Sequence, residues 1–383
     1  MQKSLRFFFA NDTMRLNMKN YQPQLINDNQ SIEDLCSQAK RAGVVGLDTE
    51  FMREKAYFAE LCLVQMSIGE EYFLIDTLAL TKDTVAYQSL ANMIADPGIV
   101  KVVHSCSQDV EVLFNFFNTV PESIFDTQLA AGFCGFDGQI GYANIVMSEC
   151  DVELDKSQTR TNWLQRPLSD KQLKYAVNDV VYLLPLYEKF VDELMKQQRI
   201  DWFEEESERV VQSAIDNQDA DKAYMRMNGS HLSLKKQQLL VFLSNLRERN
   251  AQLSNKPRPW ILKDVDVYTI VNGLPMSRKS LFSLDVSAGF VKRNADEIIQ
   301  FVQNIGTDLV RVWEATQPFT PQQKAQVKRL SQELNDLSKN SGVARSLIAN
   351  RKDIESYISG HAVRFEQGWR AELIGDSLSA LIE

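Results

Sequence analysis

The sequence predicts an α/β domain followed by two small all-helical domains. Residues 25–198 alternate short apolar runs with longer amphipathic segments, which is typical of a sheet flanked by helices. Beyond Leu232 only helical patterns occur, and turn-like segments interrupt them at KPRPW (256–260), NGLPMS (272–277) and TQPFTPQ (316–322). A chain of 383 residues is also too long for one ordinary hydrophobic core.

The elements of the first half follow from local patterns. Ser31 is a candidate N-cap for a helix, and Gly69-Glu70-Glu71 separates two apolar runs as a hairpin turn would. Three strands before the next long helix indicate a mixed sheet. Strands are expected at GVVGLDTEF (43–51), Glu60–Ile68, Tyr72–Asp76 and Ile99–Ser105, and helices at Ser31–Arg41, Ser107–Phe117 and Asp170–Gln197, the last opened by Pro167 and Ser169.

Composition changes mark the domain boundaries. An acidic segment, WFEEESERV, and a polar one, SAIDNQDADKAY, indicate a helix and a linker after Asp201. We therefore expect a flexible extension at 1–20, the α/β domain at 21–205, and helical domains at 215–300 and 318–383.

Composition favours a cytoplasmic globular protein. The five cysteines are odd in number and scattered, with no C-x-x-C, which argues against a disulfide framework and a zinc site and for a reducing compartment. No apolar run approaches the length of a membrane span, so we expect no membrane partner.

Charge is distributed unevenly along the chain. The formal net charge is −9, yet residues 222–300 hold 13 Lys and Arg against six Asp and Glu. An acidic body joined to a basic module indicates a polyanionic partner such as a nucleic acid. A solvated basic face without a partner is the alternative that charge alone leaves open.

Two carboxylates stand at the end of the apolar strand GVVGLDTEF. Side chains two residues apart in a strand share a face, so Asp48 and Glu50 project together. Placing like charges side by side is costly unless a cation lies between them, and Mg²⁺ or Mn²⁺ prefers carboxylate oxygens. A D-x-E triplet is a weak signal by itself, because most such triplets are solvated surface.

Further candidates occur beside other predicted core elements. Asp109 lies early in an otherwise apolar helix, where a carboxylate is favoured by the helix N-terminus without any further role. Tyr175 and Asp179 are four apart on one helical face, where a buried Tyr–Asp hydrogen bond is the plain alternative. Four acids and a tyrosine in this order indicate a shared metal-dependent site.

These motifs resemble a known family. Asp-x-Glu on a first strand, Asp after a later strand, and Tyr-x-x-x-Asp on a late helix are the pattern of DEDD-type 3'→5' exonucleases of the tyrosine subgroup. The blocks LDTEF, LCLVQ, HSCSQDVEVL, FDTQLAAGF and LDKSQTRTNWLQRPLSDKQLKYAVNDVVYLLPLY, within residues 40–190, are similar to ribonuclease D. The helical domains resemble the helicase-and-RNase-D C-terminal (HRDC) domains of that family. The resemblance implies a ribonuclease H-like mixed-sheet fold.

The departures from the family pattern are minor. Gln108 replaces an acid that many relatives have beside the motif aspartate, and Ala59 stands where a proline is common. Lys174 occupies a position that excludes the histidine subgroup.

The resemblance also implies roles for the motif residues. Asp48, Glu50 and Asp179 would hold a divalent ion that activates water. Asp48 would bridge to a second ion at the departing 3'-oxygen, and Asp109 would serve that second site. Tyr175 would orient the attacking water. The expected cofactors are two divalent cations, Mg²⁺ or Mn²⁺.

Substrate contacts are expected around the motifs and on the basic module. Single-stranded 3' ends are held by aromatic stacking and backbone contacts. For His104 a structural role at a strand end is favoured over a catalytic one. Core packing is an equal alternative for Phe58, and a loop packed against the sheet is the alternative for Lys156, Arg160 and Trp163. The candidates are Tyr57, Phe58, Gln65, His104, Lys156, Arg160 and Trp163 in the first domain and, in the second, Lys256, Arg258, Trp260, Lys263, Arg278, Lys279, Phe282, Lys292 and Arg293.

The leading hypothesis is a 3'→5' exoribonuclease that trims tRNA precursors and other small structured RNAs with single-stranded 3' ends and releases 5'-nucleotides. Two alternatives are a DNA-directed exonuclease of the editing type and a non-catalytic RNA-binding protein that retains the fold. No obligatory protein partner is indicated.

Overall fold

The computed structural model describes residues 23–155, 161–314 and 318–375. The predicted extension at 1–20 and the candidates Lys156 and Arg160 lie outside the described residues. The chain divides into two compact units. The first contains the described residues up to Met52, Glu60–Ala214 and the described residues from Phe319 on; the second contains Arg53–Ala59 and Ile215–Pro318. No helix within the described ranges is long and apolar enough to cross a membrane.

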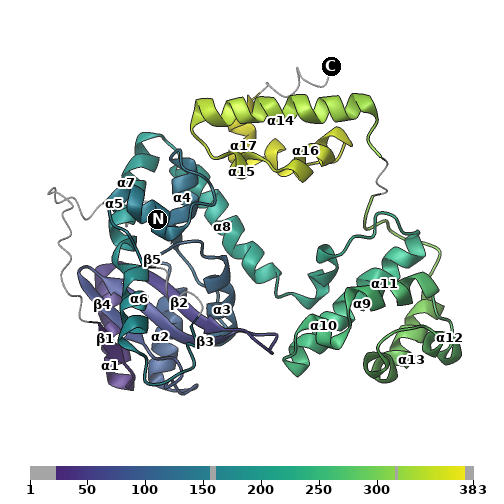
Figure 1. Ribbon diagram of the computed structural model, residues 1–383, viewed down its shortest axis with the longest axis horizontal. Coiled ribbons are helices and arrows are strands. Elements are labelled where there is room, and N and C mark those ends of the chain that lie inside the picture. Colours follow the sequence, from purple (N-terminus) through teal and green to yellow (C-terminus); the bar gives the residue numbers. More distant parts are fainter. Residues whose placement is uncertain (1–22, 156–160, 315–317, 376–383) are drawn as a thin grey trace. The chain divides into compact units, whose positions relative to one another are not determined.

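A six-stranded mixed sheet forms the centre of the first unit, in the order β1-β4-β3-β2-β5-β6 (Figure 1). β2, β3 and β4 pair antiparallel, whereas β1 on β4, β5 on β2 and β6 on β5 are parallel. The expected mixed sheet is confirmed. The strands are β1 (Gln24–Ile26), β2 (Val44–Met52), β3 (Glu60–Ile68), β4 (Glu71–Ile75), β5 (Val100–Val103) and β6 (Ile124–Asp126).

Helices follow the strands of this sheet. The helix predicted at Ser107–Phe117 is confirmed as α3. The N-cap of α1 is Asp28, not Ser31 as expected, because the Asp28 side chain accepts the backbone N–H of Ser31. The helices are α1 (Asn29–Ala42), α2 (Val85–Ala95), α3 (Ser107–Phe117), α4 (Thr127–Phe133), α5 (Tyr142–Cys150), α6 (Asp170–Val181), α7 (Leu183–Lys196) and α8 (Ile200–Asp216).

The single long helix expected at Asp170–Gln197 is wrong, because the structure divides it into α6 and α7 at Tyr182. Pro185 lies in the first turn of α7, where it lacks an N–H to continue the hydrogen bonding of α6 but is compatible with a new helix start.

The helix pair α6–α7 lies close to the central strand. A Cβ added to Gly46 would stand 2.3 Å from Ser67 Oγ and 3.2 Å from Leu183 Cβ. Ser67 Oγ in turn donates a hydrogen bond of 3.1 Å to the Val180 carbonyl of α6. This close approach sets the distance between α6 and the face of β2 that carries the motif acids.

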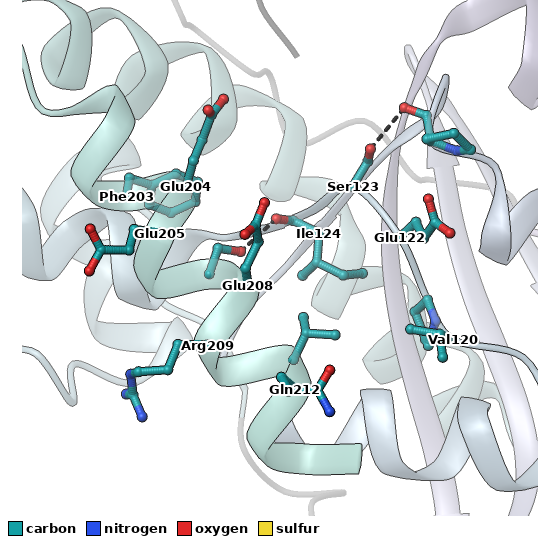
Figure 2. Close-up of a pocket in the computed structure, with 14 residues that line it drawn as sticks. Val120, Glu122, Ser123, Ile124, Phe203, Glu204, Glu205, Glu208, Arg209 and Gln212 are labelled. Carbon is teal, nitrogen blue, oxygen red and sulfur yellow. Dashed lines mark hydrogen bonds between the residues drawn. The ribbon is translucent and has the colours of Figure 1, made fainter. Parts of the chain in front are cut away.

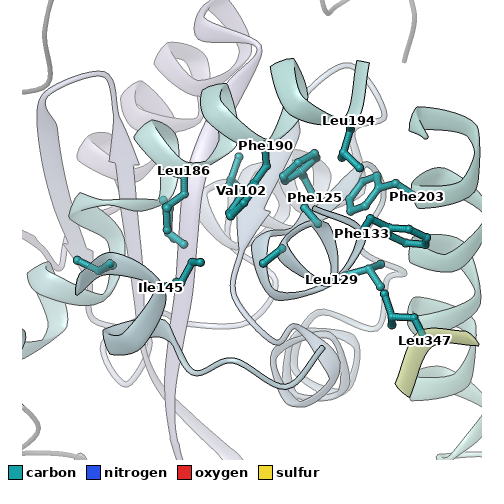
Figure 3. Packing of buried hydrophobic residues seen from close by; sticks show 14 of the residues in the cluster. Val102, Phe125, Leu129, Phe133, Ile145, Leu186, Phe190, Leu194, Phe203 and Leu347 are labelled. Atoms are coloured by element: carbon teal, nitrogen blue, oxygen red, sulfur yellow. The ribbon is translucent and has the colours of Figure 1, made fainter. Parts of the chain in front are cut away.

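The C-terminal helices belong to the same unit as the sheet. Leu347 packs against the cluster formed by Leu129, Phe133 and Phe203 (Figure 3). Arg370 donates a 2.6 Å ion-pair contact to Glu206, and both side chains are only 2% exposed. Their helices are α14 (Pro321–Ser341), α15 (Arg345–Ile348), α16 (Arg351–Ile358), η2 (Arg364–Glu366) and α17 (Gly368–Ile374).

The second unit is helical and has its own core around α9. Leu239, Leu240 and Leu243 of α9 are fully buried against the remaining helices. Tyr57 belongs to this core although it precedes α9 by far in the sequence. The elements are η1 (Ala220–Arg226), α9 (Leu234–Ser254), α10 (Arg258–Ile261), α11 (Asp264–Gly273), α12 (Arg278–Phe282) and α13 (Ala288–Asn304).

Candidate active site

Three carboxylates from two elements converge over the sheet. Asp48 and Glu50 project from the same face of β2, and Asp179 projects from α6, which covers that face. One oxygen of each carboxylate lies within 4.8 Å of the others. A β-bulge between Glu50 and Phe51 interrupts the pairing of β2 with β3 directly after these acids. The three side chains are half-buried and so remain open to solvent on one side.

Asp109 projects from the first turn of α3, where its charge is favoured by the helix N-terminus. It is not one of the three carboxylates within 4.8 Å of one another, but its charge raises the pKa of all three. Thr49, between the two acids of β2, donates a hydrogen bond of 2.5 Å from its hydroxyl to Asp109 Oδ1. Both side chains are buried. Thr49 therefore fixes the fourth acid to the strand that carries the first two, a role that the sequence pattern did not reveal.

Burial raises the pKa of every one of these acids, and repulsion by neighbouring carboxylates adds to the rise. Desolvation raises the pKa of Glu50 to about 9, with Asp179 and Asp109 adding repulsion. The same causes, burial first, raise the pKa of Asp179 to about 8 and bring that of Asp48 well above its ordinary range. Burial also raises the pKa of Asp109 to about 7, although the Thr49 hydroxyl opposes the rise. The fold thus holds together acids that repel one another.

Divalent cations fit this donor set. Hard cations such as Mg²⁺ and Mn²⁺ take carboxylate oxygens as ligands and retain several waters, which the solvent-open side of the cluster allows. A bound cation would also relieve the repulsion that raises the pKa of Asp48, Glu50 and Asp179. The acidic cluster is therefore suited to divalent metal ions.

Tyr175 lies one helical turn before Asp179 on α6 and so on the same side of that helix. Trp163, one of the predicted substrate contacts, is 2% exposed, and its ring lies 6.1 Å from that of Tyr175. Arg166 donates to the Trp163 carbonyl and binds both oxygens of Asp76 at 2.7 Å. Trp163 thus supports Tyr175 from within the core.

Asp126 organises the loop that leads into α3. Its carboxylate accepts the backbone N–H groups of Ser105 and Cys106 on that loop. It also accepts those of Gln128 and Leu129 and so caps α4. Asp126 therefore fixes the start of α3, the helix that carries Asp109. This residue was not among those predicted from the sequence, although it lies in the block FDTQLAAGF.

His104 precedes this loop and has partners within the fold. Its Nδ1 lies 2.9 Å from the Thr127 hydroxyl and its Nε2 lies 3.0 Å from the Ile140 carbonyl. Burial lowers the pKa of the imidazole. These contacts match the structural role favoured for it from its position at a strand end.

Tyr142 is a further residue that sequence reasoning missed. Its hydroxyl accepts the backbone N–H of Tyr182 at the α6–α7 break, 3.2 Å away. Burial raises the pKa of the phenol well above its ordinary range, and the charges of Asp179 and Asp48 add to the rise. Tyr142 therefore lies within electrostatic reach of the cluster. A tyrosine at the start of a short helix carries no signal that would have revealed this.

Gln65 is directly opposite Asp48 in the β2–β3 ladder, so the two side chains share a face of the sheet. The side chain is fully buried, and neither its amide nitrogen nor its oxygen has a hydrogen-bond partner among the described residues. Such a group costs about 1–3 kcal/mol unless a water or a ligand satisfies it. Its contact with substrate stays a prediction.

Tyr57 and Phe58 lie in the second unit. Tyr57 is 7% exposed and donates a hydrogen bond of 2.5 Å from its hydroxyl to Glu248. The backbone N–H groups of both residues donate to the Asn255 side chain at 3.0 Å. Arg258 pairs with Glu248 at 2.6 Å and lies over the Tyr57 ring. Tyr57 and Arg258 therefore stabilise this unit, and any contact with substrate stays a prediction.

The remaining candidates of the second unit are at its surface. Trp260 is 59% exposed and Phe282 is 43% exposed, unusually high values for large hydrophobic side chains. Arg278 binds Asp296 at 2.6 Å in an exposed pair of little energetic weight. The other exposed cations of the predicted set are Lys256, Lys263, Lys279, Lys292 and Arg293.

Comparisons with known proteins agree with this geometry. A family model described as 3'-5' exonuclease matches residues 23–195. Ribonuclease D of Shewanella sp. (strain ANA-3) is 31% identical, and the match covers 94% of this chain and 94% of the relative. Ribonuclease D of Acidiphilium cryptum is 32% identical, over 93% of this chain and 92% of the relative. The crystal structure of Escherichia coli RNase D, described as an exoribonuclease involved in structured RNA processing, superposes with a TM-score of 0.80 at 27% identity and covers 95% of this chain and 99% of that one. The chain therefore belongs to the ribonuclease D family of 3'→5' exonucleases.

Proposed function

We propose that this protein is a 3'→5' exoribonuclease that trims the 3' ends of tRNA precursors and other small structured RNAs and releases 5'-nucleotides. The observation that carries the proposal is the convergence of Asp48, Glu50 and Asp179 within 4.8 Å beside Asp109. Family membership, and the involvement of the Escherichia coli relative in structured RNA processing, support the substrate class. The five free cysteines are consistent with work in the reducing cytoplasm.

In this proposal Asp48, Glu50 and Asp179 would hold one divalent ion. Asp48 would also serve a second ion, with Asp109 acting in that second site through water. Two such ions, Mg²⁺ or Mn²⁺, would supply a nucleophilic water at neutral pH and offset the charge on the leaving 3'-oxygen. Tyr175 would orient the attacking water by a hydrogen bond, since a phenol is a poor general base. Trp163 and Thr49 keep Tyr175 and Asp109 in place.

The second unit would hold the body of the RNA. We propose that it contains the first HRDC-type domain and that α14–α17 form the second. Its exposed cations suit contacts with phosphates, and the exposed ring of Trp260 suits stacking on an unpaired base. Lys256 and Lys279 are expected to contribute affinity that falls with added salt.

The test uses a tRNA that is labelled at its 5' end and extended by a short 3' tail, with the purified protein in Mg²⁺. Stepwise shortening is expected to stop with EDTA and with Asp179→Asn, and a DNA strand of matched sequence should be shortened much more slowly. Equal rates on DNA would favour the editing-type alternative. RNA binding without shortening in Mg²⁺ or Mn²⁺ would favour the non-catalytic alternative.

A further inference from the structure

A groove of about 820 Å³ lies within the first unit, between the α4–α5 loop and the C-terminal helices. The loop Gly135–Gln139 forms one wall, and one face of α14 together with the starts of α15 and α16 forms the other. A Cβ added to Gly138 would stand 2.3 Å from Ser346 Oγ, so this glycine permits the two walls to meet at the base. The polar side chains of the second wall are Ser331, Asn335, Ser338, Lys339, Arg345, Ser346, Asn350 and Arg351.

The charge of the groove is positive, with three cations against Asp137. Lys339 is 76% exposed and has only a 3.9 Å contact with Asp336. Arg351 is 82% exposed and pairs with Glu355 one turn along its own helix. Exposed pairs of this kind contribute little energy, so both side chains are available to another anion.

Arg345 is the least compensated of the three cations. Its half-buried guanidinium donates to the Asn335 side chain and to the Ala349 carbonyl, both of them neutral acceptors. In residues 23–155, 161–314 and 318–375, no carboxylate forms an ion pair with it. Burial lowers the pKa of this guanidinium, and the charge of Asp353 opposes the fall without cancelling it. A desolvated cation in an open groove favours an anionic ligand.

The loop wall of the groove is followed along the chain by a segment that lies near the active site. Directly after Gln139, the Ile140 carbonyl accepts hydrogen bonds from His104 and Gln128 at 3.0 Å. Two residues later comes Tyr142, whose phenol lies within electrostatic reach of Asp179. The groove and the carboxylate cluster are therefore flanked by the same short segment of chain.

A second hollow of the first unit provides a contrast. It has a volume of about 720 Å³ and lies between α8 and the segment 120–124 (Figure 2). Glu122, Glu204, Glu205 and Glu208 line it with Arg209 as their cationic counterpart. Such a surface repels phosphates. The two hollows thus differ in the charge that they would accept.

We propose that the groove between the α4–α5 loop and α14–α16 binds the phosphodiester backbone of the RNA substrate. Lys339 and Arg351 contact phosphates directly, and Arg345 provides a fixed positive charge at the base. The contacts are to the backbone, so they carry no sequence preference. This site lies in the same unit as the carboxylates and is separate from the basic surface of the second unit. The inference rests on the proposed exoribonuclease function.

The test reverses charge at the two exposed positions and leaves Arg345 intact, since Arg345 also holds the Ala349 carbonyl. The variant Lys339→Glu/Arg351→Glu is compared with Lys324→Glu/Lys352→Glu. The control makes the same charge change at exposed positions of the same two helices, outside the groove. Thermal unfolding midpoints close to that of the wild type establish that both variants fold.

For the tailed tRNA, the groove variant should raise KM on the order of tenfold, with a much smaller effect on kcat, whereas the control stays close to wild type. The slope of log Kd against log salt should become shallower by about 1.4, since two phosphate contacts are lost. If the two variants have equal KM values and equal salt slopes, the groove does not bind the RNA backbone and the inference is overturned. Trimming by the wild type in the same assay would still support the proposed function. Absence of trimming by the wild type would instead refute the proposed function itself.

Discussion

Replacement of Asp179 by Asn should stabilise the metal-free protein while it removes activity. Burial and Asp109 raise the pKa of this carboxyl from 3.8 to about 8. At pH values below its ordinary pKa the Asp179 carboxyl is protonated in both the folded and the unfolded state. Its titration then has no effect on stability. As pH rises from 3.8 towards 8 the unfolded chain ionises first, and the folded state loses stability relative to it.

The magnitude follows from linkage. Each pH unit between the unfolded and the folded pKa lowers the free energy of unfolding by about 1.4 kcal/mol. About three such units lie below pH 7, so the ionisation of Asp179 destabilises the metal-free wild type at pH 7 by up to about 4 kcal/mol. Asp179→Asn should therefore raise the free energy of unfolding in EDTA by up to about this amount at pH 7 and by little at pH 4. The exposed Asp170, on the same helix, is the control, and Asp170→Asn should change stability by less than about 0.5 kcal/mol.

Urea unfolding in EDTA at pH 7 and pH 4 measures this directly. With Mn²⁺ the wild type should become more stable than Asp179→Asn. Only the wild type retains its full set of metal ligands, so it gains more stability by binding the ion. A metal-free Asp179→Asn variant that is no more stable than wild type at pH 7, or that gains equally at both pH values, would show that the ionised Asp179 carboxylate does not destabilise the fold.

Three further predictions concern the support of the site. Asp126→Asn should lower the free energy of unfolding by about 2–3 kcal/mol in urea unfolding and should also lower kcat. The cause is that an amide has one acceptor oxygen for the four N–H groups that the carboxylate binds. An unchanged kcat would contradict the role of Asp126 in positioning α3. Gly46→Ala should cost about 1–3 kcal/mol in the same assay through the clash with Ser67 Oγ, and adding Ser67→Ala should recover part of the loss. Mn²⁺ binding should release protons and should weaken as pH falls from 8 to 6. Glu50 and Asp179, with pKa values raised to about 9 and about 8, must ionise before they can bind the ion. Calorimetry in buffers of different ionisation enthalpy measures the proton release, and finding none would contradict this prediction.

The elements with strong periodic patterns were predictable from the sequence. The strand at Glu60–Ile68 and the helix at Ser107–Phe117 have the expected bounds. The five motif residues could be chosen because each interrupts an apolar element with a polar group. The break at Tyr182 was missed because α6 and α7 have continuous apolar patterns, and only the role of Pro185 separates them.

What the sequence did not reveal depends on tertiary contacts. Tyr57 is held by Glu248, which lies 191 residues further along the chain. The four N–H groups around Asp126 converge only in the folded structure. The last helices join the exonuclease unit because Leu347 meets Gly132 and the Ala344 N–H donates to the Gly132 carbonyl, contacts that follow from shape and not from a local pattern.

The most direct test of the account counts the metal ions that the carboxylate cluster holds. Free Mn²⁺ can be measured by electron paramagnetic resonance during a titration of the protein at pH 8, with saturating uridine 5'-monophosphate as a reaction product in the site. Two bound ions per wild-type chain are expected, with a loss of at least one in Asp109→Asn. A wild-type count of one or none would contradict the claim that Asp48, Glu50, Asp109 and Asp179 form a two-ion centre.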